Sequence, residues 1–282
     1  MLKIDLSKCT KCGACERTCP AFVIEFNKET GPVEKYPETC IICGHCVAVC
    51  PVDAIVHEKM DMDDFKPIKD PEINYEQLMH LIRNRRSIRR YKKEPIKEED
   101  MKKIIDAVRY IPTAENNQEL KYLVINDQDQ LMEIKRKMAG IMKFASTLLK
   151  IFFFIKPILP KSLKSTVKLQ NERWQNGGEN GKEDPFLRNA RTLLIIYAKK
   201  KSTLSLWDAG IASYNIELIC ETLGIGSVWN GVHAIMSGIF RKLKKLSLVP
   251  KGHKIVATIG LGYPKTTFHK TINRKALRWK IK

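Results

Sequence analysis

Eight cysteines, arranged as two copies of one spacing, constrain the fold of this chain more than any other feature. The pattern C-x2-C-x2-C-x3-C-P occupies residues 9–20 and returns at residues 40–51. Two-residue gaps allow consecutive sulfur atoms to curl around one small metal centre. Gly13 and Gly44 relax the backbone where each loop has to close tightly. The repeat therefore predicts two compact sulfur-lined sites near the N-terminus.

Zinc sites and a disulfide framework also use clustered cysteines. Zinc usually takes four ligands from two separated pairs, rather than three closely spaced thiolates and a fourth. Disulfide frameworks belong to small secreted domains, and residues 1–8 lack the apolar segment of a secretion signal. No apolar run approaches the ~20 residues of a membrane span. The spacing favours iron–sulfur clusters, which imply a reducing compartment, and we expect a cytoplasmic protein.

The spacing resembles that of bacterial two-cluster ferredoxins, and the resemblance covers residues 1–60. In those proteins three thiolates of each repeat hold one [4Fe–4S] cube, and the fourth ligates the other cube. The resemblance thus implies two [4Fe–4S] clusters. The ligands expected for the first cluster are Cys9, Cys12, Cys15 and Cys50, and those expected for the second are Cys40, Cys43, Cys46 and Cys19.

The rest of the chain is long enough for a second domain with its own core. Residues 61–73 are acidic, proline-bearing and aperiodic, so we interpret them as a linker to a domain at 74–282. Residues 1–70 carry 9 Lys and Arg against 12 Asp and Glu, which gives this segment a net charge of −3. The net charge of the whole chain is +19, so residues 71–282 carry +22. This charge suits an anionic cofactor or an acidic partner. No basic and aromatic binding motif supports nucleic acid.

Apolar periodicity predicts the elements of the second domain. Asn74 and Gln77 form a potential capping box for a first helix, and Cys220 falls on an apolar helical stretch, which indicates a core residue. The other expected elements are a helix from Lys97, a strand at 121–126, a helix at 128–142, a buried strand at 192–198, a helix at 209–223, a short basic helix capped by Ser237 and a strand at 253–261.

Residues 143–185 form an insertion that is first apolar and basic and then polar and glycine-rich. Three interpretations fit its apolar and basic part, residues 143–169. It forms a lid over a hydrophobic substrate pocket, an arm packed across a dimer, or an interfacial helix on anionic lipid. The apolar residues lie on all sides rather than on one stripe, which favours the lid or the arm over membrane contact.

Four motifs occur in order in the second domain. They are Arg85-Arg86-Ser87-Ile88-Arg89, P-T-x-x-N-x-Q at 112–118, G-x-G-S-x-W-x-G at 224–231, and I-G-x-G-Y-P at 259–264 followed by a basic tail. Each motif alone is more often a turn or a solvated charge cluster. Together they resemble the nitroreductase family of FMN flavoenzymes over residues 75–280. The resemblance implies an α+β fold with a mainly antiparallel sheet, and an intertwined homodimer with FMN at the subunit interface.

The resemblance also assigns residues to FMN. Guanidinium and hydroxyl groups suit the phosphate dianion, and Arg85 and Ser87 are expected to bind it, with Arg86 in the same motif and Arg274 and Lys275 closing over it. Arg89 is expected near the pyrimidine edge, where a positive charge stabilises the reduced flavin anion. The ribityl chain and ring are expected to contact Thr113, Asn116, Gln118 and the amides of Asn230 and Gly231. No catalytic side chain is assigned, and His233 is interpreted as structural rather than as a proton donor.

The two modules predict an iron–sulfur flavoprotein oxidoreductase. A cluster passes one electron at a time, whereas FMN accepts electrons singly and delivers them as a pair. We expect a low-potential donor, a ferredoxin or NAD(P)H, to reduce the clusters, the clusters to reduce FMN, and the flavin to reduce a small nitro, quinone-like or activated alkene compound. The alternative is a relay module that passes electrons to a partner complex, docked at an acidic protein or a membrane surface.

Overall fold

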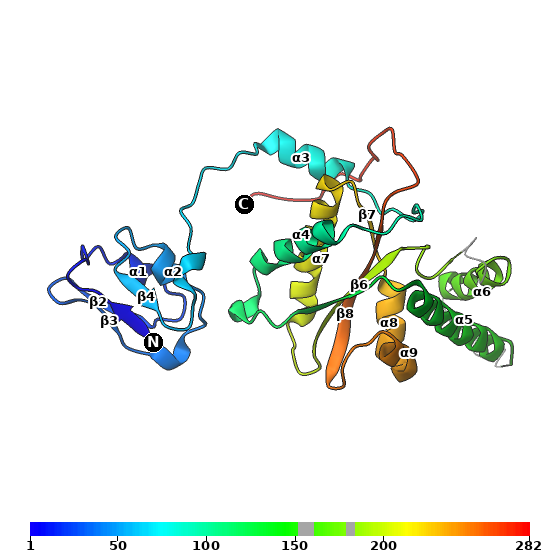
Figure 1. The fold of residues 1–282 in the computed structure, drawn as a ribbon, viewed down its shortest axis with the longest axis horizontal. Coiled ribbons are helices and arrows are strands. Elements are labelled where there is room, and N and C mark those ends of the chain that lie inside the picture. The colour runs from blue at the N-terminus through cyan, green and yellow to red at the C-terminus, as the bar shows by residue number, and fades with distance from the viewer. Residues whose placement is uncertain (152–160, 179–183) are drawn as a thin grey trace. The chain divides into compact units, whose positions relative to one another are not determined.

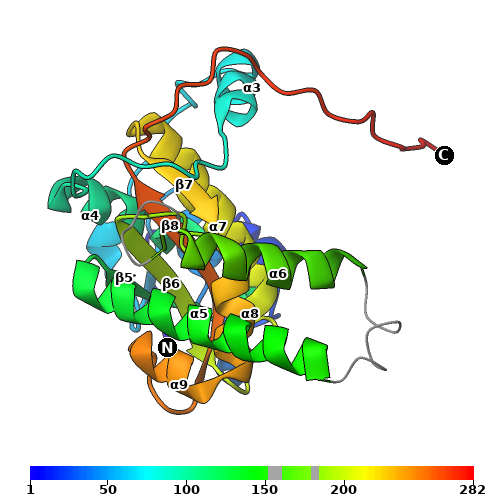
Figure 2. The ribbon, with the colours of Figure 1, turned by 90° about the vertical axis from the view of Figure 1, so that its right-hand side faces the viewer.

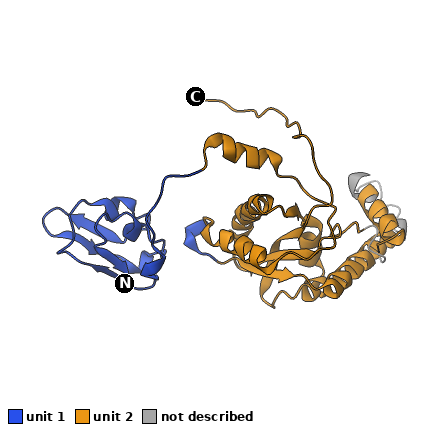
Figure 3. Cartoon of the chain, turned by 45° about the horizontal axis from the view of Figure 1, so that its top comes forward, with its two compact units in different colours: residues 1–72, 113–118 blue, residues 73–112, 119–282 orange. Residues whose placement is uncertain are grey.

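The computed structural model describes residues 1–151, 161–178 and 184–282, which form two compact units (Figures 1 and 3). The first unit contains Met1–Glu72 and Thr113–Gln118, and the second contains Ile73–Pro112 and Glu119–Lys282. The split after residue 72 falls within the segment that the sequence indicates as a linker. The grouping of Thr113–Gln118 with the cysteine motifs was not foreseen from the sequence.

The first unit consists of two small antiparallel sheets and short helical segments (Figure 1). Strand β1 (Leu2–Ile4) pairs with β4 (Ile55–His57), and β2 (Ile24–Asn27) pairs with β3 (Gly31–Glu34). The helical segments are α1 (Ala14–Thr18), α2 (His45–Ala48) and the 3-10 turns η1 (Pro37–Thr39), η2 (Met62–Asp64) and η4 (Ala114–Asn116). The buried core is small and consists of Cys15, Val23, Ile24, Val47 and Ile55.

The sequence repeat is also a repeat of backbone conformation. The second motif follows the first by 31 residues, the difference between Cys9 and Cys40. Residues at this offset share left-handed φ angles, which are 52° and 52° at Lys11 and Ile42, 69° and 72° at Gly13 and Gly44, and 53° and 49° at Phe22 and Asp53. Left-handed φ is unfavourable for residues other than glycine. Its recurrence at matched non-glycine positions shows that both loops are held in the same constrained shape.

The second unit is built on one four-stranded antiparallel sheet, as expected from the sequence. The strand order is β5-β6-β8-β7, and the strands are β5 (Lys121–Ile125), β6 (Thr192–Lys199), β7 (Gly226–Trp229) and β8 (His253–Gly262). On β6, Leu194 and Ile196 belong to one hydrophobic cluster while Leu193 and Ile195 belong to another. These four side chains are fully buried, which explains why β6 is a continuous apolar run rather than an alternating one.

Helices cover both faces of this sheet (Figures 1 and 2). One face packs against α4 (Glu98–Ala107) and α7 (Ser205–Thr222) through Ile104, Ala209, Ala212 and Ile216. The other packs against α5 (Gln128–Ile151), α8 (Gly231–Ile239) and α9 (Arg241–Leu246). The remaining segments are α3 (Tyr75–Asn84), which contacts α7, the 3-10 turn η3 (Val108–Tyr110), and α6 (Lys161–Gln175), which contacts α5.

Most of the expected helix ends agree with the structure. The capping box is confirmed, since Asn74 Oδ1 accepts from Gln77 N at 3.0 Å and Gln77 Oε1 accepts from Asn74 N at 2.9 Å. Cys220 is fully buried in α7, as expected. The assignment of Ser237 as a helix cap is wrong, because Asn230 caps α8 and this helix continues through Ser237 to Ile239. Helix α9 starts after Phe240 instead.

The insertion is described in part. Helix α5 continues beyond the expected end at residue 142 to Ile151, and α6 runs from Lys161 to Gln175. Residues 152–160 and 179–183 lie outside the described residues, and the lid, dimer arm and lipid-facing helix depend on them. The three interpretations therefore stay predictions. Across the described ranges, no helix combines the length and the apolar character needed to cross a membrane.

Candidate functional site

The eight motif cysteines divide into two sets of four, each around its own cavity in the first unit. One cavity is lined by Cys9, Cys12, Cys15 and Cys50. The other is lined by Cys19, Cys40, Cys43 and Cys46. The grouping is the one that the ferredoxin resemblance implies, including the exchange of the fourth cysteine between the repeats. We call these the first and the second cysteine set.

Backbone amides point at the sulfur atoms of both sets in the same pattern. In the first set Lys11 N donates to Cys9 Sγ at 3.4 Å and Ala54 N donates to Cys50 Sγ at 3.2 Å. In the second set Ile42 N donates to Cys40 Sγ at 3.4 Å and Val23 N donates to Cys19 Sγ at 3.3 Å. Such donors stabilise the negative sulfur atoms of a metal cluster and take part in setting its reduction potential.

The donor set fits a polynuclear cluster. Four thiols line each of the two cavities. Within the described ranges, no group of three or more His, Cys, Asp or Glu side chains is placed to hold a single metal ion. Burial raises the pKa of Cys15, and it raises the pKa of Cys46 to about 11. Thiols in such surroundings give up their protons when a bound metal supplies compensating positive charge. Four thiolates per cavity match the ligation of a [4Fe–4S] cube.

Segment 113–118 belongs to the same unit as the cysteine sets and contacts the second one. Asn116 Nδ2 donates to Ile41 O at 3.1 Å and to Ile42 O at 2.8 Å, and these two residues lie between Cys40 and Cys43. Within the segment Gln118 N donates to Thr113 Oγ1 and Gln118 Nε2 donates to Asn116 Oδ1, both at 3.1 Å. Three of the expected flavin-binding residues therefore form one polar cluster beside a cysteine loop.

Four arginines line one cavity of the second unit. The cavity, of about 730 Å³ and partly open to solvent, brings together Arg85 and Arg274, which the resemblance assigns to the FMN phosphate, and Arg86 of the same motif. Arg83 also lines it, although no motif identified this residue. A guanidinium group presents several donors in a planar fork that matches phosphate oxygens. The cavity therefore suits an anion with more than one negative charge.

A buried carboxylate partly balances this positive charge. Arg85 Nη1 lies 3.6 Å from Glu217 Oε2 on α7, and the two side chains are 16% and 10% exposed. Burial raises the pKa of Glu217, and the nearby Arg85 opposes this shift. Glu217 was not identified from the sequence, because an acidic residue inside an apolar helix has no motif around it. Its position shows that Arg85 already has a counter-charge in the protein alone.

The edge of the sheet holds the arginine segment in place. Ile88 N donates to Ser227 O at 2.9 Å, and Ser87 forms a bridge with Ser227 on β7. The buried Tyr91 hydroxyl donates to Ile88 O at 2.7 Å and contacts Gly260 O at 3.1 Å. Gly226 permits this close approach, since a Cβ there would lie 2.8 Å from the Ile88 side chain. Ser87 is half-buried in this segment, and Arg89 is exposed.

The turn from β7 to α8 is also tightly bonded. Asn230 N donates to Thr258 O at 2.7 Å, and Asn230 Nδ2 donates to Phe186 O at 2.8 Å. The backbone N–H of Asn230 thus already has an acceptor, whereas Gly231 is the first residue of α8. His233 is fully buried, its Nε2 lies 3.0 Å from Ser247 Oγ, and burial lowers its pKa to about 4. These surroundings favour the structural interpretation of His233.

The structure thus places the expected site residues in two groups. With the second cysteine set it groups Thr113, Asn116 and Gln118. In the second unit it places Arg85, Arg86, Ser87, Arg89, Asn230, Gly231, Arg274 and Lys275. Lys275 lies in the exposed tail directly after Arg274.

Comparison with known proteins gives matches along most of the chain. Residues 82–263 match the model of the nitroreductase family, and residues 1–51 match that of a 4Fe-4S dicluster domain. A protein of Archaeoglobus fulgidus named as an NADH dehydrogenase/NAD(P)H nitroreductase is 27% identical over 195 residues, which are 67% of this chain and 87% of that protein. A protein of Hydrogenibacillus schlegelii named ferredoxin 7Fe is 39% identical over 57 residues, 20% of this chain and 70% of that protein.

A solved structure shares the fold of the second unit. It is a nitroreductase with bound FMN from Bacteroides fragilis NCTC 9343, with a TM-score of 0.58 and 20% sequence identity. The match covers 73% of this chain and 98% of that chain. The likeness supports the α+β architecture described above.

The buried Glu217 leads to a prediction about pH. Because burial raises its pKa above the ordinary value of 4.5, the folded chain binds this proton more tightly than the unfolded chain. The contribution of Glu217 to stability therefore falls as the pH rises from about 4.5 through the raised pKa. Glu217→Gln abolishes this fall, so the free energy of unfolding of the variant rises relative to that of wild type as the pH increases above about 4.5. Urea unfolding followed by tryptophan fluorescence measures it, since all four tryptophans lie in the second unit.

Glu133→Gln serves as the control, because Glu133 is an exposed residue of α5. Its stability curve should run parallel to that of wild type over the same pH range. A parallel curve for Glu217→Gln as well would contradict the account of the buried carboxylate.

Proposed function

Because the chain belongs to the nitroreductase family, we propose that it is an FMN-dependent oxidoreductase that receives electrons through two [4Fe–4S] clusters. The observation that carries this proposal is the division of eight cysteines into two sets of four around separate cavities, in one chain with an arginine-lined cavity. Neither module alone accounts for both features.

The arginine-lined cavity is the proposed binding site of the FMN phosphate. Arg85, Arg86 and Arg274, which line the cavity, supply the guanidinium groups. Ser87 and Lys275 do not line it and are proposed, from the same motif and the same tail, to add a hydroxyl and a charge. In this arrangement Glu217 holds Arg85 in place before the phosphate arrives. Arg89 is the proposed charge beside the flavin ring, and the amide of Gly231 is the proposed donor to the ring edge. FMN, when bound, supplies the exchange between single electrons and electron pairs.

The second cysteine set is the proposed exit towards the flavin. Asn116 bonds to the carbonyls of Ile41 and Ile42 inside the loop that carries Cys40 and Cys43. In the nitroreductase resemblance the same segment, with Thr113 and Gln118, contributes to the flavin site. The segment is therefore the proposed link between the second cysteine set and the flavin.

The proposed substrates follow from the chemistry of the two cofactors. A low-potential donor, a ferredoxin or NAD(P)H, supplies the electrons, and a small nitro, quinone-like or activated alkene compound receives them. The Archaeoglobus fulgidus relative is named for NADH and NAD(P)H, which supports testing nicotinamides as donors beside ferredoxin.

A homodimer is the proposed assembly. Large apolar side chains are exposed along α7 and in the C-terminal tail, and a monomer rarely leaves a large continuous apolar surface uncovered. They are Leu206, Trp207, Ile211 and Tyr214 on α7, and Leu277, Trp279 and Ile281 in the tail. Light scattering during size exclusion should give twice the chain mass of 32.4 kDa. A monomer that turns over substrate would contradict this assembly.

Arg274→Gln tests the phosphate site. The variant removes a charge-assisted hydrogen bond and should weaken FMN binding about tenfold or more. Titration of the flavin-free chain with FMN, followed by quenching of flavin fluorescence, measures the dissociation constant. Lys280→Gln, an exposed change in the same tail, should leave the constant nearly unchanged. Equal constants for Arg274→Gln and wild type would remove Arg274 from the site.

Replacement of cluster ligands tests the electron route. A chain with Cys12→Ser and Cys43→Ser should lose most of its rate of FMN reduction by a reduced ferredoxin, because one ligand of each cluster is missing. Asn116→Leu, which removes both bonds to the second cysteine loop, should slow the same step while all iron stays bound. Cys220→Ala is the matched control, since this buried cysteine of α7 lines neither cysteine cavity. If FMN is reduced equally fast without the clusters, the proposed route is wrong.

A further inference from the structure

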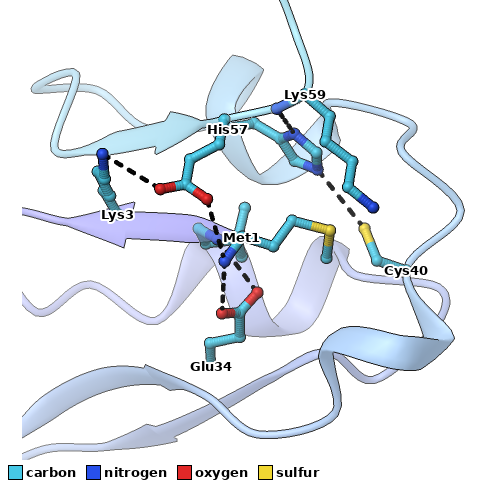
Figure 4. A network of polar contacts seen from close by, with 8 residues as sticks. Met1, Lys3, Glu34, Cys40, His57 and Lys59 are labelled. Carbon is cyan, nitrogen blue, oxygen red and sulfur yellow. Dashed lines mark hydrogen bonds and ion pairs between the residues drawn. The ribbon is translucent and has the colours of Figure 1, made fainter.

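His57 is buried beside a cysteine of the second set, and no motif assigned it a role. It ends β4, its side chain lines the cavity of the second set, and the residue is 1% exposed. Its Nε2 lies 3.7 Å from Cys40 Sγ, which is within hydrogen-bonding range for sulfur (Figure 4). The two groups come from different parts of the first unit, since Cys40 follows η1 and His57 closes the β1–β4 pair.

The other ring nitrogen determines where the imidazole proton lies. Lys59 N donates to His57 Nδ1 at 3.2 Å, so Nδ1 acts as an acceptor and carries no proton (Figure 4). A neutral imidazole with an accepting Nδ1 has its proton on Nε2. This proton therefore faces Cys40 Sγ, and His57 is the donor in the contact with sulfur.

The surrounding strands hold His57 at this point. His57 pairs with Leu2 in the antiparallel β1–β4 register, and Leu2 N donates to Glu34 Oε1 at 3.1 Å. Lys3 Nζ and Glu58 Oε1 form an ion pair at 3.1 Å on the same two strands (Figure 4). Strand pairing therefore holds the backbone of His57, and the hydrogen bond from Lys59 N orients its ring.

The histidine makes the two cysteine sets chemically unequal. Each set receives two backbone N–H donors at matched positions, so the backbone treats both sets alike. The position 31 residues before His57 is Phe26, which occupies the same place on β2 and has no side-chain donor. The first set has a nearby cation, Arg17, but this side chain is exposed, and it donates to Cys12 O rather than to a sulfur atom. The Thr10 side chain does hydrogen-bond Cys12 of the first set, but that thiol is exposed. The side-chain donor of the second set is buried instead.

We propose that His57 is a positioning residue that raises the reduction potential of the cluster held by Cys19, Cys40, Cys43 and Cys46, acting through Cys40. The inference rests on the proposed function, which assigns a [4Fe–4S] cluster to each cysteine set. Reduction adds one electron to the cluster and increases the negative charge on its sulfur ligands. A buried N–H donor stabilises the reduced form more than the oxidised form. The proton stays on Nε2 throughout.

This tuning has a direction that fits the electron route. A higher potential draws the electron to the second set, whose loop is the one that Asn116 contacts. The first cluster, without a buried side-chain donor, would then pass its electron on rather than keep it.

Two substitutions separate hydrogen bonding from packing. His57→Phe keeps a ring of similar shape and removes the donor, and His57→Gln keeps an N–H donor at the corresponding reach. In the full chain with both cofactors bound, a redox titration followed by low-temperature EPR measures the potential of each cluster. We expect His57→Phe to shift the reduction equilibrium of one cluster about tenfold towards the oxidised form, which is about 59 mV for a one-electron couple. His57→Gln should restore most of this shift, and the other cluster should keep its potential.

Val56→Ala is the matched control, because Val56 is the exposed neighbour of His57 on β4 and its side chain points to the opposite face. It should change neither potential. Unchanged potentials in His57→Phe would overturn the inference. An equal shift of both clusters, or an equal shift in His57→Phe and His57→Gln, would overturn it as well.

A measurement on the native histidine covers the case in which His57→Phe fails to assemble its cluster. His45 also lines the cavity of the second set. His45→Ala removes this second histidine, so that His57 is left at the cavity. When this variant is labelled with nitrogen-15 histidine, pulsed EPR should detect a histidine nitrogen coupled to one reduced cluster. Absence of this coupling would overturn the role of His57.

Iron analysis distinguishes failure of the proposed function from failure of the inference about His57. If the chain binds fewer than two [4Fe–4S] clusters, the proposed function fails. If it binds both clusters but the His57 variants leave both reduction potentials unchanged, only the inference about His57 fails.

Discussion

The first unit depends on holding eight sulfur atoms in two closed sets of four. Its central hydrophobic cluster has only five buried residues, too few to order a segment of this length by hydrophobic burial alone. The ligand loops also adopt left-handed φ angles at Lys11 and Ile42, which cost free energy in an isolated chain. Metal–thiolate bonds are the interaction able to offset both costs, because binding energy at such a site is also folding energy. The matched loops, the amide donors and the buried His57 all follow from this requirement.

The second unit is stabilised in a different way, and its buried polar side chains form ion pairs rather than sets of metal ligands. Two hydrophobic clusters enclose the sheet, so it is stable enough to bury ion pairs. Lys135 pairs with the fully buried Asp184 at 3.2 Å, and Asp184 also accepts three amide hydrogen bonds in the turn at 186–189. Phe186 of this turn accepts the side-chain hydrogen bond of Asn230, so the buried pair supports the start of α8. Arg85 and Glu217 make the second pair, which gives Arg85 a counter-charge in the cavity proposed for the FMN phosphate.

Features that depend on spacing along the chain were predictable, and features that depend on the tertiary fold were not. The cysteine sets follow from residue gaps, and the buried strand β6 follows from an unbroken apolar run. Ser237 was misassigned as a cap because Asn230, seven residues earlier, starts a helix that continues past it. His57, Glu217 and Arg83 carry no motif, since each acquires its role from a residue distant in the sequence. The one local signal for His57 was its position at the end of a short strand, where alternate residues are buried.

The order in which the cofactors are reduced tests the central claim most directly. In a stopped-flow experiment the unmodified, fully loaded chain is mixed anaerobically with a reduced ferredoxin, and the absorbance of the clusters and of the flavin is followed in time. The account predicts that the broad cluster absorbance bleaches first and that the flavin band falls afterwards, at a rate independent of ferredoxin concentration. A flavin band that falls first, or at a rate that rises with ferredoxin concentration while the clusters stay oxidised, would contradict it.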